Sequence, residues 1–131
     1  MLPPAPPAIL EVYYAPSCAP CRLELPALAQ FARDGHSHLR IVIVSEPARA
    51  MGELKNASPR LLAAAVSSAS AAPRATLLEA GDTDAILPYA RSLLPNGKIC
   101  ARWRGGVTVD RARALVAACA RAITVRRPQR S

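Results

Sequence analysis

The 131-residue chain has few aromatic side chains and no long apolar run. Only 4% of its residues are Phe, Trp or Tyr, which counts against recognition of single-stranded nucleic acid by base stacking. No run of eighteen apolar residues occurs, so the sequence predicts no membrane-spanning helix. A net charge of +8 favours acidic partners, anionic membrane surfaces or nucleic acid. Because the only dense basic cluster is Arg126, Arg127 and Arg130, we expect no nucleic-acid partner.

The N-terminus lacks the helix-forming core of a signal peptide. Four prolines in MLPPAPPAIL exclude such a core and predict an extended, polyproline-like lead-in over residues 1–7. We expect either a cytosolic chain, or one from which an export signal or membrane anchor has been removed. Residues 8–123 are long enough for one domain, and residues 124–131 are predicted to be a basic tail.

The order of the apolar segments predicts an α/β fold. Ala8–Tyr14 is β-branched and aromatic, which indicates a buried strand. A helical pattern begins at Cys18, with a kink expected at Pro26 and an end near Gly35. Leu39–Ser45 is a continuous apolar run, typical of a parallel strand covered on both faces. Strand, helix and strand at this spacing predict a right-handed βαβ unit.

The second half predicts short helices, then two strands and a helix. Glu46–Ala72 indicates one or two short helices, and Ala75–Ala80 a short strand. The β-like runs around Pro95-Asn96-Gly97 predict a hairpin. Thr108 is a plausible N-cap for the last helix. The apolar stripe of that helix is expected to be Ala112, Leu115, Val116, Cys119 and Ile123.

Cys18 and Cys21 form a Cys-x-x-Cys at the predicted start of the first helix. There, unsatisfied backbone N–H groups and the helix dipole stabilise an anion, which lowers the pKa of a first cysteine from about 8.5 towards 7 or below. The pattern predicts a redox dithiol, in which Cys18 attacks a disulfide and the more buried Cys21 resolves the mixed disulfide. Ala19 and Pro20 would tune the balance between the two redox forms. Arg22 would add positive charge that favours the thiolate.

Two other interpretations of the cysteine pair stay open. A zinc or iron–sulfur site needs four ligands, typically a second Cys-x-x-Cys or a His pair. Cys100 and Cys119 are too far apart in sequence for that motif, and His36 and His38 lie beyond the far end of the first helix. We therefore expect no metal, with copper as the best-suited alternative. The remaining interpretation is two buried, unreactive thiols.

Pro88 lies immediately before a predicted strand and follows Leu87. X-Pro bonds are the main place where a cis peptide occurs. A proline is equally well tolerated at the start of a strand. The residues alone leave both interpretations open.

The segment Tyr14–Pro26, YAPSCAPCRLELP, resembles the thioredoxin family. Within it, the segment is most similar to the TlpA-like branch of extracytoplasmic thiol–disulfide oxidoreductases, some of which serve cytochrome c maturation. Pro88, the Pro95–Ile99 turn and Gly105 or Gly106 extend the resemblance over nearly the whole chain. It implies a thioredoxin fold, in which a βαβ unit and a ββα unit share a mixed central sheet flanked by helices.

The resemblance also implies roles for individual residues. Cys18 would be the nucleophile and Cys21 the resolving thiol, with their redox-active disulfide in place of any cofactor. Pro88 would be cis and would face the dithiol together with Leu87. The remaining residues of the implied substrate groove are Ser17, Ala19 and Pro20.

Glu24 has two candidate interpretations, and the sequence departs from the family pattern in three ways. Glu24, one helical turn after Cys21, is a candidate for moving the proton of Cys21, or else a solvated acid of the first turn.

The departures concern Ser17, the start of the chain and Arg91. Ser17 stands where many members carry Trp, and the chain begins directly at the first core strand, without the usual N-terminal extension. Arg91 lies in the strand after Pro88, where an apolar residue is common, so it needs a partner or a route to solvent.

By this resemblance the chain is a protein-disulfide oxidoreductase that acts as a reductant. Its partners would be a protein thiol or disulfide substrate and an upstream electron-donor protein, and the chain would be a monomer. The implied location is periplasmic or otherwise extracytoplasmic, with membrane association only through an anchor missing from this chain; the cytoplasm is the alternative. Functions of another class are a Cu(I)-binding metallochaperone and a docking module with a redox-inactive dithiol.

Cys100 and Cys119 are not expected to pair. Cys119 belongs to the apolar stripe of the last helix, which predicts a buried, inert thiol. Cys100 alternates with Ile99, Ala101 and Trp103. If those three pack on the last helix, Cys100 points away from Cys119.

Overall fold

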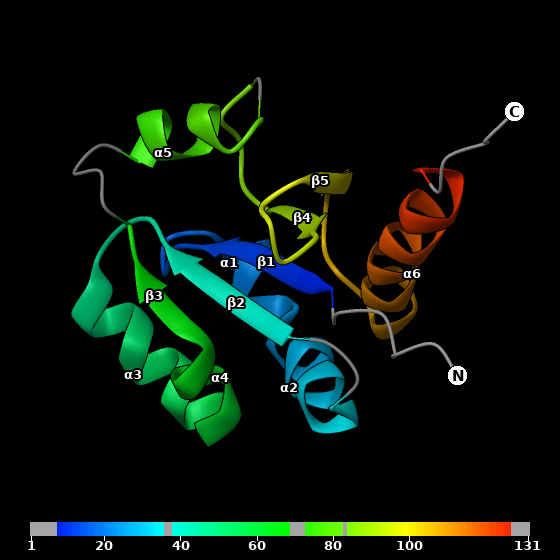
Figure 1. Cartoon of the computed structure of the whole chain (residues 1–131). Coiled ribbons are helices and arrows are strands. Elements are labelled where there is room, and N and C mark those ends of the chain that lie inside the picture. Colours follow the sequence, from blue (N-terminus) through cyan, green and yellow to red (C-terminus); the bar gives the residue numbers. More distant parts are fainter. Residues whose placement is uncertain (1–7, 36–37, 69–72, 83, 127–131) are drawn as a thin grey trace, which may run out of the picture.

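The structure is a computed structural model that describes residues 8–35, 38–68, 73–82 and 84–126, with side chains described up to residue 122. Its strands are β1 (Ile9–Tyr14), β2 (His38–Ile43), β3 (Ala65–Ser67), β4 (Tyr89–Leu93) and β5 (Ile99–Arg104). They form one mixed five-stranded sheet in the order β3-β2-β1-β4-β5 (Figure 1). β2 is parallel to β1 and β3, whereas β4 is antiparallel to β1 and β5. The predicted α/β class, with a βαβ unit and a ββα unit around a mixed sheet, is confirmed.

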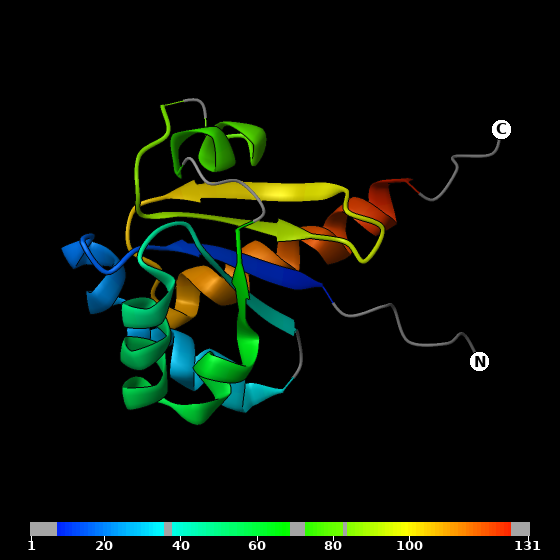
Figure 2. The same cartoon turned by 90° about the vertical axis from the view of Figure 1, so that its left-hand side faces the viewer.

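Helices cover the two faces of the sheet unequally. They are α1 (Ala19–Leu23), α2 (Leu25–Asp34), α3 (Pro47–Ala57), α4 (Pro59–Ala64), α5 (Pro73–Glu79) and α6 (Val109–Arg126). Figure 2 shows α5 on one side of the sheet, with α2, α3, α4 and α6 on the other. Among the helices that the structure describes, the short α5 therefore covers its face alone.

β1 has buried residues on both sides because the two faces of the sheet have separate cores. Leu10 and Val12 point into the larger core, together with apolar side chains of α2, α4 and α6. Tyr13 points the other way and packs with Val42 and with Leu77 of α5. Successive side chains of a strand alternate between faces, so burial on both faces gives a continuous apolar run.

The first helical pattern is divided by its proline, as expected. α1 ends at Glu24, and α2 begins with Leu25 and has Pro26 in its first turn, where a missing N–H costs nothing. α2 ends at Gly35, which has a φ of 71°, a left-handed conformation suited to glycine. The break places Glu24 between two helices.

Two predictions for the middle of the chain are wrong in part. Ala75–Ala80 lies in α5 and the turn after it, because Leu77 and Ala80, three residues apart, both pack on the sheet as helical spacing requires. Glu46–Ala72 does contain the expected helices, α3 and α4, but also the unpredicted strand β3. β3 has three residues at the edge of the sheet, and its Ala-Val-Ser sequence gives little strand signal.

The C-terminal half follows its turn and capping residues. Pro95-Asn96-Gly97 connects β4 to β5, with a φ of 91° at Gly97. Thr108 caps α6, since its hydroxyl oxygen accepts a hydrogen bond from the backbone N–H of Arg111 at 3.0 Å. α6 continues to Arg126, beyond the domain end expected at residue 123. Residues 1–7 and most of the predicted basic tail lie outside the described residues.

Cys100 and Cys119 form a disulfide, with 5.0 Å between their Cα atoms, so the prediction that they stay apart is wrong. The reason is a β-bulge in β5. Ser92 pairs with Ala101 but Leu93 pairs with Ile99, which leaves Cys100 as the extra residue. A bulge interrupts the alternation of side chains on which the prediction relied, and it changes the direction in which the side chain of the extra residue points.

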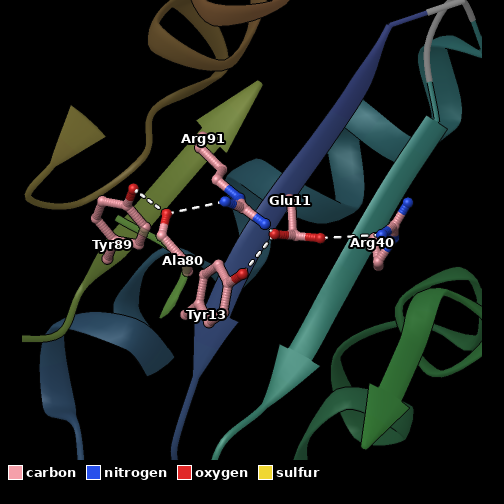
Figure 3. A network of polar contacts seen from close by, with 6 residues as sticks. All are labelled: Glu11, Tyr13, Arg40, Ala80, Tyr89 and Arg91. Carbon is pink, nitrogen blue, oxygen red and sulfur yellow. Dashed lines mark hydrogen bonds and ion pairs between the residues drawn. The ribbon is translucent and has the colours of Figure 1, made fainter. Parts of the chain in front are cut away.

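Arg91 has the partner that its position requires. Its Nε lies 2.7 Å from Oε1 of Glu11, a buried residue of β1 directly opposite in the sheet. Oε2 of Glu11 accepts from Arg40 of β2 at 3.0 Å, and the Tyr13 hydroxyl donates to Oε1 (Figure 3). This polar network spans three strands on the α5 face.

No helix in the described part of the chain is both long and apolar enough to cross a membrane.

Candidate active site at the Cys18–Cys21 disulfide

The turn after β1 places Cys18 at the start of α1. After Tyr14 the chain turns, and the backbone N–H of Cys18 donates to Ala15 O at 3.0 Å. Cys18 is the N-cap residue of α1, and its Sγ accepts a hydrogen bond from the backbone N–H of Cys21 at 3.2 Å. A free donor of the first helical turn therefore points at the sulfur, which is where a negative charge would be stabilised.

The two cysteines are joined in a disulfide and differ in exposure. Cys21 is fully buried, and its Sγ lies 4.0 Å from the carbonyl oxygen of Tyr13. Cys18 is partly exposed. In a thiol–disulfide exchange, only the sulfur that a substrate can reach can attack it. Of the two sulfurs, that of Cys18 is the one a substrate can reach, and the predicted roles of Cys18 as nucleophile and Cys21 as resolving thiol stay predictions.

The predicted groove residues come from two segments of the chain. Ser17, Ala19 and Pro20 are exposed, in the turn before α1 and in its first turn. Leu87 precedes Pro88 in a cis peptide bond, as the resemblance implies. Leu87 and Cys18 pack against the same two apolar clusters, so the fold brings together segments about seventy residues apart in the chain. Their contact with a substrate stays a prediction.

Glu24 is buried, so its interpretation as a solvated acid is wrong. Its Oε2 accepts a hydrogen bond from the backbone N–H of Val107 at 2.8 Å. Its Oε1 is buried without a hydrogen-bond partner among the described residues. Burial raises the pKa of this carboxyl from its ordinary value of 4.5 to about 7, against a smaller opposite effect of the Val107 hydrogen bond. A carboxyl that titrates near neutral pH is able to take up or release a proton under working conditions.

Arg22 binds the turn rather than a carboxylate. Its exposed guanidinium donates to the carbonyl oxygen of Pro16, two residues before Cys18. This contact fixes the backbone that leads into the dithiol. The effect of Arg22 on a Cys18 thiolate stays a prediction.

Two exposed apolar side chains, each next in the chain to predicted site residues, were missed in the sequence. Leu23 is 81% exposed at the end of α1, and Ile86 is 54% exposed just before Leu87. A hollow of about 240 Å³ adjoins Leu23. It is lined by Pro20, Leu23, Glu24, Gly106, Val107 and Thr108. Leu23 falls outside the apolar positions of the helical pattern that begins at Cys18, which are Leu25, Leu28, Ala29 and Ala32, and that mismatch was the available signal.

The loop that carries Leu87 and Pro88 is fixed by polar contacts that the sequence did not reveal. Ala80 O accepts hydrogen bonds at 2.9 Å from both the Tyr89 hydroxyl and Arg91 Nη1 (Figure 3). Arg104 contacts Asp82 at 2.7 Å and Asp84 at 2.5 Å. These partners come from β4 and β5, so no local sequence pattern relates them to the loop.

The described residues contain no group of three or more His, Cys, Asp or Glu side chains that could hold a metal ion. Within the site, the donors available to a metal would be the two sulfurs of Cys18 and Cys21. Both are engaged in their disulfide in this structure.

Comparison with known proteins finds similar structures but no matching sequence family. No family profile and no curated protein matches the chain. A thioredoxin-related protein from Neisseria meningitidis serogroup B is 21% identical, with a TM-score of 0.72 over 88% of this chain and 87% of that chain. A thioredoxin-family thiol:disulfide interchange protein from Chlorobium tepidum TLS is 14% identical, with a TM-score of 0.67 over 85% and 78%.

A secreted thiol-disulfide isomerase from Corynebacterium glutamicum is also similar, at 14% identity and a TM-score of 0.66 over 86% of this chain and 70% of that chain. At such identities the likeness concerns the fold. The chain has the thioredoxin fold.

Proposed function

We propose that this chain is a thiol–disulfide oxidoreductase that reduces protein disulfides through Cys18 and Cys21. The observation that supports this most directly is the position of Cys18. Its sulfur is partly exposed, accepts a hydrogen bond from a backbone N–H of the first turn of α1, and is bonded to a fully buried partner cysteine.

The reaction starts from the reduced dithiol. The Cys18 thiolate attacks one sulfur of the substrate disulfide, a bond forms between them, and the other substrate sulfur leaves as a thiolate. Cys21 then loses its proton and attacks Cys18 Sγ. This forms the Cys18–Cys21 disulfide and releases the second substrate thiolate. Two electrons have passed to the substrate, and a dithiol of an upstream donor protein must return them.

Glu24 is the proposed acceptor of the Cys21 proton. It follows Cys21 by one helical turn, and its backbone N–H donates to Cys21 O at 3.3 Å. With a pKa raised to about 7 by burial, its carboxylate is a much stronger base than an exposed glutamate. Its unpartnered Oε1 is the atom available to take the proton.

We also propose a location outside the cytoplasm, which the second disulfide supports. Cys100 and Cys119 form a second disulfide, and such bonds persist in oxidising compartments but are rare in the cytosol. The similar protein of Corynebacterium glutamicum is described as secreted. The resemblance to the TlpA-like branch supports the immature protein of cytochrome c as one substrate class, since some of those reductants serve cytochrome c maturation.

The test compares single cysteine variants in the reduction of insulin and of a peptide disulfide. Cys18→Ser should abolish reduction, because no other described thiol has this position. Cys21→Ser should accumulate a mixed disulfide between Cys18 and the substrate, detectable by mass spectrometry. A Cys100→Ser/Cys119→Ser double variant is the control and should keep its activity. Unchanged reduction by Cys18→Ser would contradict the proposal, as would Cu(I) uptake by the dithiol without reductase activity.

A redox titration of the Cys18–Cys21 pair decides the direction. A potential near −270 mV, like that of thioredoxin, is expected for a reductase. A value about 100 mV or more higher would mean an oxidase or isomerase.

A further inference from the structure

The sheet face beneath α5 carries more arginine than its acidic residues neutralise. Arg40 and Arg91 share the single carboxylate of Glu11, at 3.0 and 2.7 Å (Figure 3). Arg104 is paired with both Asp82 and Asp84. On α5 itself, the exposed Glu79 and Arg74 form no ion pair among the described residues.

Arg102 is left without a carboxylate. It lies on β5 directly opposite Arg91 of β4. Like charges directly opposite in a sheet are destabilising. Among the described residues Arg102 forms no ion pair, and its side chain is exposed. Its polar partner within the chain is the Tyr89 side chain, a neutral group, so its charge is available to a carboxylate of another molecule.

A hollow has formed around Arg102. It measures about 520 Å³ and is lined by Gly81, Tyr89, Arg102, Trp103 and Arg104. A Cβ atom on Gly81 would lie 2.7 Å from Arg102 Nε, and Gly81 has a φ of 95°. Glycine at this position therefore lets the guanidinium lie against the loop, where it lowers the pKa of Tyr89, opposing the larger effect of burial.

The hollow lies next in the chain to the cis-proline segment of the proposed substrate groove. Tyr89, in its wall, directly follows Pro88. Tyr89 belongs to the apolar cluster against which Cys18 and Leu87 pack. Residues that flank the substrate disulfide would meet Arg102 where the substrate extends from Leu87 and Pro88 along β4.

We propose that the hollow at Arg102 binds an acidic side chain of the substrate protein, close in sequence or space to the disulfide that Cys18 attacks. The proposal rests on the proposed function, and it names a preference among substrates. A guanidinium presents paired N–H donors that match a carboxylate, which makes an Asp or Glu side chain the best-fitting occupant.

The experiment uses three peptide disulfides with the same cysteine-containing core. Their flanking residues are acidic, neutral or basic. For the wild-type chain we expect kcat/KM to fall in that order, and the preference to shrink as salt is added. In Arg102→Gln, kcat/KM for the acidic peptide should fall by roughly two- to fivefold, the range of an exposed ion pair, while the value for the neutral peptide stays the same.

Arg60→Gln is the matched control. Arg60 is exposed on α4, on the opposite side of the sheet, and its removal changes the net charge by the same amount. An equal loss for Arg60→Gln and Arg102→Gln would overturn the proposal, because net charge alone would then explain the preference. So would a preference that Arg102→Gln leaves unchanged. Circular dichroism checks that both variants are folded.

Failure of the proposed function gives a different result. If the wild-type chain reduces none of the three peptides, the function is wrong. Binding of the acidic peptide with its cysteines replaced by serine, followed by fluorescence anisotropy, then tests the hollow independently. Binding that weakens in Arg102→Gln but not in Arg60→Gln would still support the acidic site, and equal binding by all three proteins would exclude it.

Discussion

Glu24 Oε2 accepts the backbone N–H of Val107 at 2.8 Å, which ties the break between α1 and α2 to the segment just before α6. The carboxyl is buried, and burial raises its pKa to about 7 although the Val107 hydrogen bond acts in the opposite direction.

The folding stability of the oxidised protein should depend on the charge of Glu24. The pKa of its carboxyl is about 7 in the folded chain and near its ordinary 4.5 when unfolded, so the folded state binds the proton more tightly. Protonated Glu24 therefore contributes to the free energy of unfolding in full below pH 4.5. This contribution is lost as the pH rises towards 7 and is absent at higher pH. Relative to Glu24→Gln, the wild-type chain should lose about 3 kcal/mol between pH 4 and pH 8. Urea denaturation of both proteins across this range measures the difference, and a constant difference would contradict the prediction.

Glu24→Gln should also slow the second step of the reaction. Without an acceptor for its proton, Cys21 attacks Cys18 more slowly, by about 10²-fold at pH 7. A preformed mixed disulfide between Cys18 and a coloured aromatic thiol reports this step directly, because resolution by Cys21 releases the thiol. The first attack, by Cys18 on a fresh substrate, should keep its rate. Equal slowing of both steps would indicate a general structural defect instead.

Arg91→Met should destabilise the fold by about 2 kcal/mol. The variant leaves buried Glu11 with one of its two arginine partners and removes a donor to Ala80 O. The comparison is Arg113→Met, which removes an exposed ion pair with Asp34 at 3.0 Å and should cost less than about 1 kcal/mol. Chemical denaturation at pH 7 measures both. Similar losses in the two variants would mean that the network in Figure 3 contributes no more than a surface pair.

Removal of the second disulfide should lower stability and leave the chemistry intact. Cys100 and Cys119 are 19 residues apart, so the loss of their bond restores the freedom of a loop of that size in the unfolded chain. A Cys100→Ser/Cys119→Ser variant is expected to lose about 3 kcal/mol of unfolding free energy. Denaturation midpoints and insulin reduction are measured on the same samples. A loss of catalysis at a temperature where the variant is folded would contradict a purely structural role.

The features that were predicted correctly depend on residues close together in the sequence. Gly35 and Thr108 mark helix ends through their own backbone or hydroxyl, and Asn96-Gly97 marks the hairpin through its turn conformation. The dithiol was found for the same reason, because its chemistry depends on two cysteines at the start of one helix.

The errors at Cys100, Glu24 and Glu11 concern contacts between distant segments. The bulge at Cys100 arises from the pairing of two strands, and neither strand alone shows it. Glu24 is buried by Val107, more than eighty residues later, so its helix alone could not distinguish a buried acid from a solvated one. The sequence shows Glu11 only as a charged residue within an apolar strand. Its role became clear from the structure, in which Arg91 and Arg40 of the two neighbouring strands both pair with its carboxylate.

Two disulfides give the chain the capacity for four electrons, although the proposed reaction transfers two. Each pair joins a partly exposed cysteine, Cys18 or Cys100, to a buried one, Cys21 or Cys119. The pairs differ in position, because Cys18 is the N-cap of α1 whereas Cys100 lies in a bulge of β5. We expect a donor protein that docks at Cys18 to reduce the first pair and to leave the second oxidised. The working reduced protein is then a half-reduced species, and alkylation after turnover should add two groups to each chain, both on the segment that contains Cys18 and Cys21.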